Sequence, residues 1–434
     1  MNNKIKIIFI LLTTITIYVA KAQNPAPSAF NQKSMLLRGG IAHIGNGTVI
    51  ENSLIGITKG KIDFVYDATT VKLQPMNYDT VMEIYGKHLY PGLIGMNTNL
   101  GLSEIEAARA TNDIYETGNI NPSSRSAIAY NTDSKIIPTV RSNGILIAQV
   151  VPSGGLVSGT SSVMQLDAWN WEDAVIKMDE GLHINWPGMR IFKAWWAPTE
   201  EEQKDRMAKG LENIKKLLRE SQSYCNEGAH QESNLNLQAM CGLFNGTKKL
   251  YIHANYVKEI VAAVNVCKEY KIKMVLVGGA DAWLIPQLLK ENNIPVIIER
   301  TQTLPGREDD DIESSYRLPA MLQAAGVVYC ISDAGFWQQR NLPFQAGNAV
   351  SYGITKEQAL ESITLTPAKI LGIEEQAGSL EQNKDATLII SDGDILDMKS
   401  NNIIAAYING RKIDLDNIQK QLYLKYCNKY GIKP

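Results

Sequence analysis

The sequence predicts an α/β protein: a TIM (β/α)8 barrel with a small β-sandwich domain built from both chain ends. From Pro91 onward, short apolar segments alternate with helical patterns, which is typical of repeated βα units. Roughly 280 residues of this texture suit a barrel better than an open sheet, because ~250 residues is usual for a barrel. The chain also has no Gly-rich phosphate loop, and both flanks consist of short β segments.

The domain boundaries follow these changes in texture. We expect a signal peptide at 1–22, a Pro-, Ser- and Asn-containing tether at 23–33, the first part of the small β domain at 34–90, the barrel at 91–372, and the second part of the small β domain with a C-terminal tail at 373–434.

The individual elements can be predicted in order. Asn46-Gly47 is a hairpin signal in the first β domain. The clearest βα unit begins with a strand at Leu250–His253 and continues with apolar residues at helical spacing from Val257 to Cys267. Further strands are expected at 273–277, 295–298 and 327–331, with helices near 283–289 and 319–325. Thr355 and Gln358 form a capping-box signal, and Gly372 marks a helix end.

Composition narrows the class of partner. The chain has 434 residues, of which 44% are hydrophobic and 20% charged, as in ordinary globular proteins. A net charge of -2 and a pI near 6.3 leave no broad cationic surface, so neither nucleic acid nor a membrane surface is predicted as a partner. We expect a small-molecule substrate or a protein partner.

The N-terminus has the features of an export signal. Lys4 and Lys6 precede an apolar run at 7–19, and Ala20-Lys21-Ala22 is a small-x-small cleavage site. The alternative, a membrane anchor, needs ~20 apolar residues, more than this run contains. We therefore expect cleavage before Gln23, export to the periplasm or the medium, and no membrane attachment afterwards.

The five cysteines fall into two groups. Cys267 and Cys330 lie in apolar segments and are expected in the core. Cys225 and Cys241 flank a polar stretch, and an oxidising compartment would allow them to form a disulfide. The sequence leaves this pairing open, because it does not fix their separation.

Two motifs carry a family resemblance. Tyr90-Pro91-Gly92-Leu93-Ile94 resembles the Pro-Gly-Leu-Ile-Asp start of the first barrel strand of amidohydrolases, and Gly378-Ser379-Leu380-Glu381 with Lys384-Asp385-Ala386 resembles their return to the β domain. Further matches are Arg38 to Gly47, Lys59 to Ile62, Leu342 to Gly347 and Leu365 to Ala368. Over almost its whole mature length the chain is similar to the amidohydrolase superfamily, in its imidazolonepropionase-like and prolidase-like branch.

This resemblance implies a metal at the C-terminal mouth of the barrel, held by His-x-His on the first strand, histidines on middle strands and an Asp on the last. Here the chain has Asn97-Thr98-Asn99 in place of His-x-His, and Gly95 in place of the usual Asp. A carboxamide oxygen is a weak ligand for zinc-like ions and suits harder cations. The resemblance thus implies a degenerate metal site.

Three further residues are candidates. By the resemblance, His253 at a strand end is a metal ligand, and Asp333 after the strand at 327–331 is a ligand that also takes a proton from the attacking water. The alternatives are a structural histidine and a helix-capping aspartate. Lys193 is either a strand-end lysine of the kind that some relatives carboxylate, or an ordinary solvated lysine. His183 shows no ligand spacing and is interpreted as a bystander.

Two functions remain open. The first is a hydrolase of C–N bonds outside ordinary peptides, in cyclic amides or amino-acid derivatives, with a divalent metal on His253 and Asp333 and with Asn97 and Asn99 as weak ligands or orienting groups. The alternative is an inactive homologue that serves as a binding module or as the partner subunit of an active paralogue, because a fold survives the loss of its site. Homo-oligomers are also compatible with this sequence.

Overall fold

The computed structural model describes residues 26–29, 33–71, 78–228 and 230–433. The predicted signal peptide and most of the tether lie outside these residues. In the described part of the chain, no helix has the length and apolar character needed to cross a membrane.

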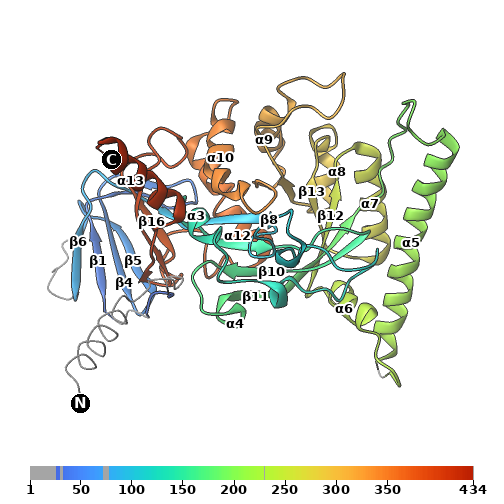
Figure 1. The fold of residues 1–434 in the computed structure, drawn as a ribbon, viewed down its shortest axis with the longest axis horizontal. Helices are drawn as coiled ribbons and strands as arrows, with labels where there is room; N and C mark the ends of the chain where they lie inside the picture. Colours follow the sequence, from blue (N-terminus) through green and yellow to red (C-terminus); the bar gives the residue numbers. More distant parts are fainter. Residues whose placement is uncertain (1–25, 30–32, 72–77, 229, 434) are drawn as a thin grey trace, which may run out of the picture.

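An eight-stranded sheet forms the centre of the molecule, in the order β15-β14-β13-β12-β11-β10-β9-β8. It curls into a nearly closed barrel between the small β domain and the long helix α5 (Figure 1). The strands are β8 (Leu93–Thr98), β9 (Ile145–Val150), β10 (Val157–Gln165), β11 (Val175–Asn185), β12 (Lys249–Ala254), β13 (Met274–Gly278), β14 (Val296–Ile298) and β15 (Tyr329–Ile331). The predicted fold class is therefore confirmed.

One strand departs from the parallel pattern expected of βα units. β10 runs antiparallel to both β9 and β11, whereas β11 to β15 pair in parallel. The connections on either side of β10 contain only the four-residue helix α4 (Trp171–Ala174). A parallel crossover needs a dozen or more residues, so these connections allow only antiparallel neighbours.

Helices cover the outside of the barrel: α2 (Ser126–Ala129), α3 (Ile137–Arg141), α5 (Glu200–Glu227), α6 (Leu235–Phe244), α7 (Val257–Tyr270), α8 (Pro286–Glu291), α9 (Ser314–Ala325), α10 (Leu342–Val350) and α11 (Lys356–Glu361). A further helix, α12 (Leu365–Leu371), packs against one end of the barrel interior. In α7 the predicted apolar face is buried, including Ile260, Val264 and Cys267. The predicted capping box of Thr355 and Gln358 begins α11. Gly372 follows α12 in the left-handed conformation, as expected of a helix end.

The small β domain combines two sheets from both ends of the chain. One has the order β5-β4-β1-β6 and the other β18-β17-β16-β7-β2-β3. The strands are β1 (Met35–Arg38), β2 (Ile41–His43), β3 (Val49–Ile50), β4 (Ser53–Thr58), β5 (Lys61–Asp67), β6 (Thr80–Glu83), β7 (His88–Pro91), β16 (Leu388–Ser391), β17 (Ile403–Ile408) and β18 (Arg411–Lys412). The last helix, α13 (Ile418–Tyr430), lies near this domain (Figure 1).

The inside of the barrel contains an apolar core beside a cluster of buried polar side chains. Its core includes Met96, Val163, Val275 and Cys330, packed with residues of α12 such as Leu371. The described α12 therefore lies against the apolar interior. Buried polar side chains of β9, β10 and β11, among them Gln149, Ser161 and Glu180, also face inward, and others lie where the parallel strands end.

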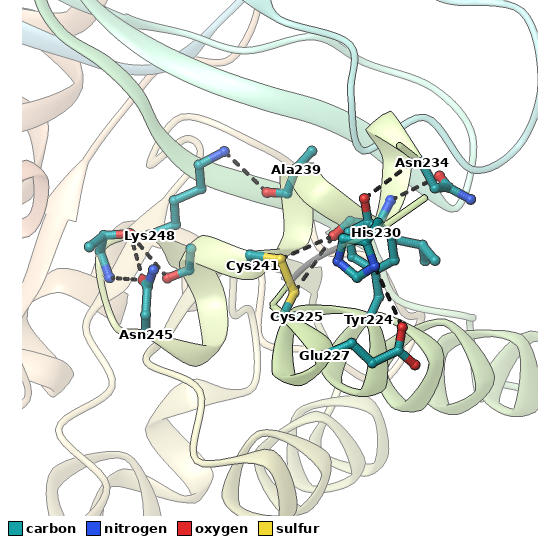
Figure 2. The surroundings of a disulfide bond; sticks show 12 residues. Tyr224, Cys225, Glu227, His230, Asn234, Ala239, Cys241, Asn245 and Lys248 are labelled. Atoms are coloured by element: carbon teal, nitrogen blue, oxygen red, sulfur yellow. Dashed lines mark hydrogen bonds and ion pairs between the residues drawn. A yellow bond between two sulfur atoms is a disulfide. The ribbon is translucent and has the colours of Figure 1, made fainter. Parts of the chain in front are cut away.

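Cys225 and Cys241 form a disulfide that joins α5 to α6 (Figure 2). Next to it, Tyr224 stacks on His230 with ring centroids 3.6 Å apart. Cys267 and Cys330 are free and buried, as predicted. The structure thus resolves the pairing that the sequence left open.

Replacing both Cys225 and Cys241 by Ala should lower the free energy of unfolding by about 3 kcal/mol, because the bond closes a loop with a sequence separation of 16 residues. Urea unfolding of the oxidised protein measures this loss. Reductant should destabilise the parent protein but not the double variant, and equal sensitivity of the two would contradict a stabilising bond. Cys427→Ser, at a free cysteine, is the control.

Candidate active site at the barrel mouth

Three predicted site residues lie at the same end of the barrel. Asn97 is in β8, His253 is in β12, and Asp333 lies just after β15. In barrels of this type, this end carries the loops that build active sites. The structure therefore brings residues that are far apart in sequence to one mouth.

Asp333 is almost fully buried, with 1% of its surface exposed. Its Oδ1 accepts a hydrogen bond from Arg300 Nε at 2.5 Å, and its Oδ2 accepts one from Gln345 Nε2 at 3.1 Å. Burial raises the pKa of Asp333, and the Arg300 guanidinium acts in the opposite direction. Both carboxylate oxygens are engaged by protein donors, so Asp333 is poorly placed to take a proton from water.

Gly95 is explained by its neighbour Gln339. A Cβ atom at Gly95 would lie 2.5 Å from Gln339 Oε1. Gln339 Nε2 donates to the carbonyl oxygens of Asp333 at 2.5 Å and Met96 at 3.3 Å. The aspartate that the resemblance implies at this position would displace Gln339. Gly95 therefore accommodates a side chain that fixes the backbone of Asp333.

Asn97 connects two parts of the mouth. It has a φ of 49°, in the left-handed region that Asn tolerates better than most residues. Its backbone N–H donates to Gln149 Oε1 at 3.1 Å, and its Nδ2 donates to Glu299 Oε1 at 3.4 Å. Burial raises the pKa of Glu299. Asn97 thus joins β9 to the residue that precedes Arg300.

Asn99 is directed away from these groups. Its Nδ2 donates to Val151 O at 2.7 Å and to Ser153 Oγ at 3.0 Å. Its amide fixes the loop after β9.

A continuous chain of hydrogen bonds runs from His253 into the barrel. His253 Nε2 lies 3.0 Å from His183 Nδ1, and His183 Nε2 lies 2.9 Å from Ser161 Oγ. Ser161 Oγ in turn donates to Glu180 Oε1 at 2.7 Å. We call these four residues the proton chain. The interpretation of His183 as a bystander is wrong, because this buried histidine forms the middle of the chain.

Glu180, at the inner end of the proton chain, is 3% exposed. It also accepts hydrogen bonds from Gln149 Nε2 at 2.5 Å and Tyr251 Oη at 2.8 Å. Burial raises the pKa of Glu180, and its three hydrogen bonds partly oppose that rise. The residue is a buried acid held by donors on three different strands.

With Glu180 as a carboxylate, one set of hydrogen positions satisfies the chain. The Ser161 hydroxyl donates its single hydrogen to Glu180, so His183 Nε2–H donates to Ser161 and His253 Nε2–H donates to His183. Burial lowers the pKa of His253 to about 4 and that of His183 well below its usual value, which keeps both rings neutral. His253 Nδ1 then carries an open lone pair. Within the described residues, this nitrogen has no hydrogen-bond partner, yet it is not a fully buried atom. We therefore infer that solvent reaches it.

The donor set does not fit the metal that the resemblance implies. In the described ranges, no three His, Cys, Asp or Glu side chains are grouped so that they could hold an ion. Asp333 is bound by Arg300 and Gln345, and His253 Nε2 is bound by His183. Zinc sites normally use three or four protein ligands. At the position of the last-strand aspartate, a guanidinium supplies the positive charge.

Lys193 lies elsewhere, in the loop between β11 and α5, where it is exposed. Of the two alternatives for Lys193, the strand-end lysine is excluded because β11 ends at Asn185, and the exposed position agrees with an ordinary solvated lysine. The same loop carries Trp195 and Trp196, which are 96% and 69% exposed. Neither tryptophan packs in the core.

Several residues of the mouth were not predicted. Arg300 and Glu299 directly follow the predicted strand at 295–298, so their position at a strand end was a usable signal. Gln149 and Ser161 do not stand at the end of a predicted strand, so the sequence contains no such signal for them. Ser161 lies beside His183 because β10 runs antiparallel to its neighbours. Only the folded chain shows that Glu180 and His183 face inward.

Comparisons with known proteins agree with this architecture. Residues 337–413 match the model of the amidohydrolase family. The chain is 19% identical over 366 residues to amidohydrolase tasK of Hapsidospora irregularis. That match covers 77% of this chain but 37% of the relative, so the chain spans little more than a third of that protein's length.

Solved structures show the same fold. An amidohydrolase from Thermotoga maritima superimposes with a TM-score of 0.77 at 21% identity, over 88% of this chain and 99% of that chain. A molinate hydrolase matches with a TM-score of 0.55 at 15% identity, over 89% and 96%. A zinc-bound adenosine deaminase from Xanthomonas campestris matches with a TM-score of 0.55 at 12% identity, over 94% and 98%.

Arg300→Met should lower the free energy of unfolding by about 3 kcal/mol, because it leaves a buried carboxylate unpaired. Asp333→Asn should add little further loss in the Arg300→Met background. Urea unfolding of the four proteins in this double-mutant cycle measures the coupling. A coupling energy near zero would show that the pair does not stabilise the mouth.

His183 and His253, the two histidines of the proton chain, should make the protein less stable as the pH is lowered. Their pKa values in the folded protein lie below the ordinary value of a histidine. Between pH 6.5 and about 4 the unfolded state therefore binds more protons than the folded state. The free energy of unfolding then falls as the pH falls, by roughly 1.4 kcal/mol per pH unit for each histidine.

Urea unfolding from pH 7 to 5 measures this slope. His253→Asn should reduce it by the share of one histidine, while the control His230→Asn should leave it unchanged. Buried carboxyl groups with raised pKa values contribute a pH dependence of the opposite sign. For this reason the measured quantity is the difference in slope between the parent protein and the variant. An identical slope in His253→Asn would contradict the neutral state of His253.

Proposed function

Because this chain is an amidohydrolase-superfamily protein, by the match at residues 337–413 and by its fold, we propose that it is an exported hydrolase of C–N bonds outside ordinary peptides. Its substrates are small cyclic amides or amino-acid derivatives. The observation that carries this proposal is the proton chain, which connects an open histidine nitrogen at the barrel mouth to a buried acid. The disulfide supports export, because such bonds persist in oxidising compartments.

In this function His253 is the base. Water attacks the carbonyl carbon of the scissile bond while His253 Nδ1 takes its proton. His253 Nε2–H passes its proton to His183, His183 passes one to Ser161, and Ser161 passes its own to Glu180. The proton count balances, and the raised pKa of Glu180 suits it to receive a proton.

Arg300 stabilises the oxyanion. Its Nε donates to Asp333 and its Nη2 to Ala334 O, while Nη1 has no hydrogen-bond partner in the described chain. The side chain is 39% exposed, so this remaining donor is accessible from the mouth. A guanidinium fixed by a buried carboxylate is a preorganised charge of the kind that stabilises developing anions. Glu299, with its raised pKa, is the acid for the leaving nitrogen.

A second candidate, a non-catalytic partner subunit of an active paralogue, is favoured by two observations. The last-strand aspartate is bound by Arg300 instead of being open to a ligand. The curated relative is also much longer than the matched region, so an amidohydrolase unit of this kind is joined there to substantial further chain. In this case the barrel would contribute surface and stability rather than chemistry.

Hydrolysis of a panel of small cyclic amides and N-acyl amino acids by the purified protein distinguishes the two. The proposal expects turnover that chelators do not reduce, and a loss of about 10²–10⁴-fold in His253→Ala. Glu180→Gln should give a similar loss while keeping the fold, and His230→Ala should be unaffected.

Each remaining outcome has a definite meaning. Activity that is lost with chelator and restored by zinc would overturn the metal-independent proton chain. No turnover of any compound, together with tight binding to an amidohydrolase paralogue that has His-x-His intact, would establish the partner role.

A further inference from the structure

A cavity lies at the end of the barrel opposite the mouth, where β12 and β13 begin. It is formed by the starts of β12 and β13, the segments leading into β14 and β15, and the end of α12, and its volume is about 750 Å³. Cavities that bind small molecules usually measure ~300–1,000 Å³. We call it the basal cavity.

The basal cavity is strongly cationic. The lysines that line it are Lys249, Lys271, Lys273, Lys290 and Lys369, and no Asp or Glu is among its lining residues. Lys369 has an ion pair, with Glu361 at 3.4 Å. Lys271 and Lys290 make no ion pair or side-chain hydrogen bond within the described residues. Among the five lysines, Lys369 is thus the one with an ion pair in the described chain, while Glu180 and Glu374 attract the Lys249 ammonium group without forming one.

Helix dipoles account for part of this pattern. Lys290 and Lys369 are in the last turns of α8 and α12, and Lys249 Nζ donates to Ile370 O at the end of α12. A cation at a helix C-terminus is favourable, because it lies at the negative end of the helix dipole. This explains single lysines. It does not explain why five converge on one cavity without an acidic residue.

The floor of the cavity is apolar. Met274, Leu289, Ile294 and Val327 line it and are each buried, whereas Val328 at its edge is 54% exposed. A hydrocarbon group placed on this floor would be removed from water, and an anionic group at the rim would meet the lysine ammonium groups.

We propose that the basal cavity binds a small amphiphilic anion, with one hydrocarbon chain on the apolar floor and a carboxylate, sulfate or phosphate head group between the lysines. The proposal concerns a site separate from the barrel mouth and is independent of the proposed hydrolase function. Charge complementarity selects the head group, and the apolar floor selects the chain.

Isothermal titration of the purified protein with octyl phosphate, below its micelle concentration, tests the proposal. Saturable binding of one equivalent is expected, weakened by added salt because the lysines are partly exposed. Inorganic phosphate and octyl glucoside, titrated separately, should each bind at least about tenfold more weakly. Equal binding of inorganic phosphate would reduce the site to simple anion binding, and equal binding of octyl glucoside would show that charge is irrelevant. Either result overturns the proposal.

Lys271→Glu with Lys290→Glu should weaken octyl phosphate binding by at least about tenfold. Within the described residues these lysines make no ion pair or side-chain hydrogen bond that the change would remove. Circular dichroism checks that the variant folds, because Lys290 also lies at the C-terminal end of α8. The matched control is Lys425→Glu with Lys429→Glu on α13, which has the same charge change next to exposed aromatic residues. An equal loss in the control, or none in the first variant, would place binding outside the basal cavity.

Discussion

The barrel mouth is organised by the need to compensate one buried negative charge. Asp333 is 1% exposed, and an unpaired carboxylate at such a position is costly. In the superfamily that the sequence resembles, a metal ion is expected to provide the compensation. Here the Arg300 guanidinium and the Gln345 amide do so. Once the positive charge comes from a side chain, the His-x-His ligands have no ion to hold, which is consistent with Asn97 and Asn99 at their positions.

The backbone around Asp333 is also adapted to a side chain, rather than a metal ion, as the source of positive charge. Gln339 holds the carbonyl groups of Asp333 and Met96, and Gly95 leaves room for it. Asn97 contacts Gln149 on one side and Glu299 on the other. The Arg300 pair and the proton chain are therefore joined through Asn97, so a change in one is expected to be felt in the other.

Along its axis the barrel has three environments. Hydrogen-bonded polar groups lie at the mouth and continue inward along the proton chain, an apolar core packs against α12 in the interior, and the cationic basal cavity lies at the other end. The buried carboxylate of Asp333 is paired with Arg300, whereas four of the five lysines in the basal cavity form no ion pair in the described chain. The two ends therefore differ in the ligand chemistry they favour.

The sequence by itself determined the barrel, the β domain from both chain ends, the helix signals at Thr355 and Gly372, and the loss of the His-x-His ligands. These features depend on local patterns: periodicity, caps and motif residues. Tertiary structure decided what took the metal's place. Arg300 meets Asp333 because β14 and β15 are adjacent, and Ser161 meets His183 because short connections force β10 to run antiparallel. Such contacts join residues from separate strands, and a single sequence does not specify which side chains face each other across a closed sheet.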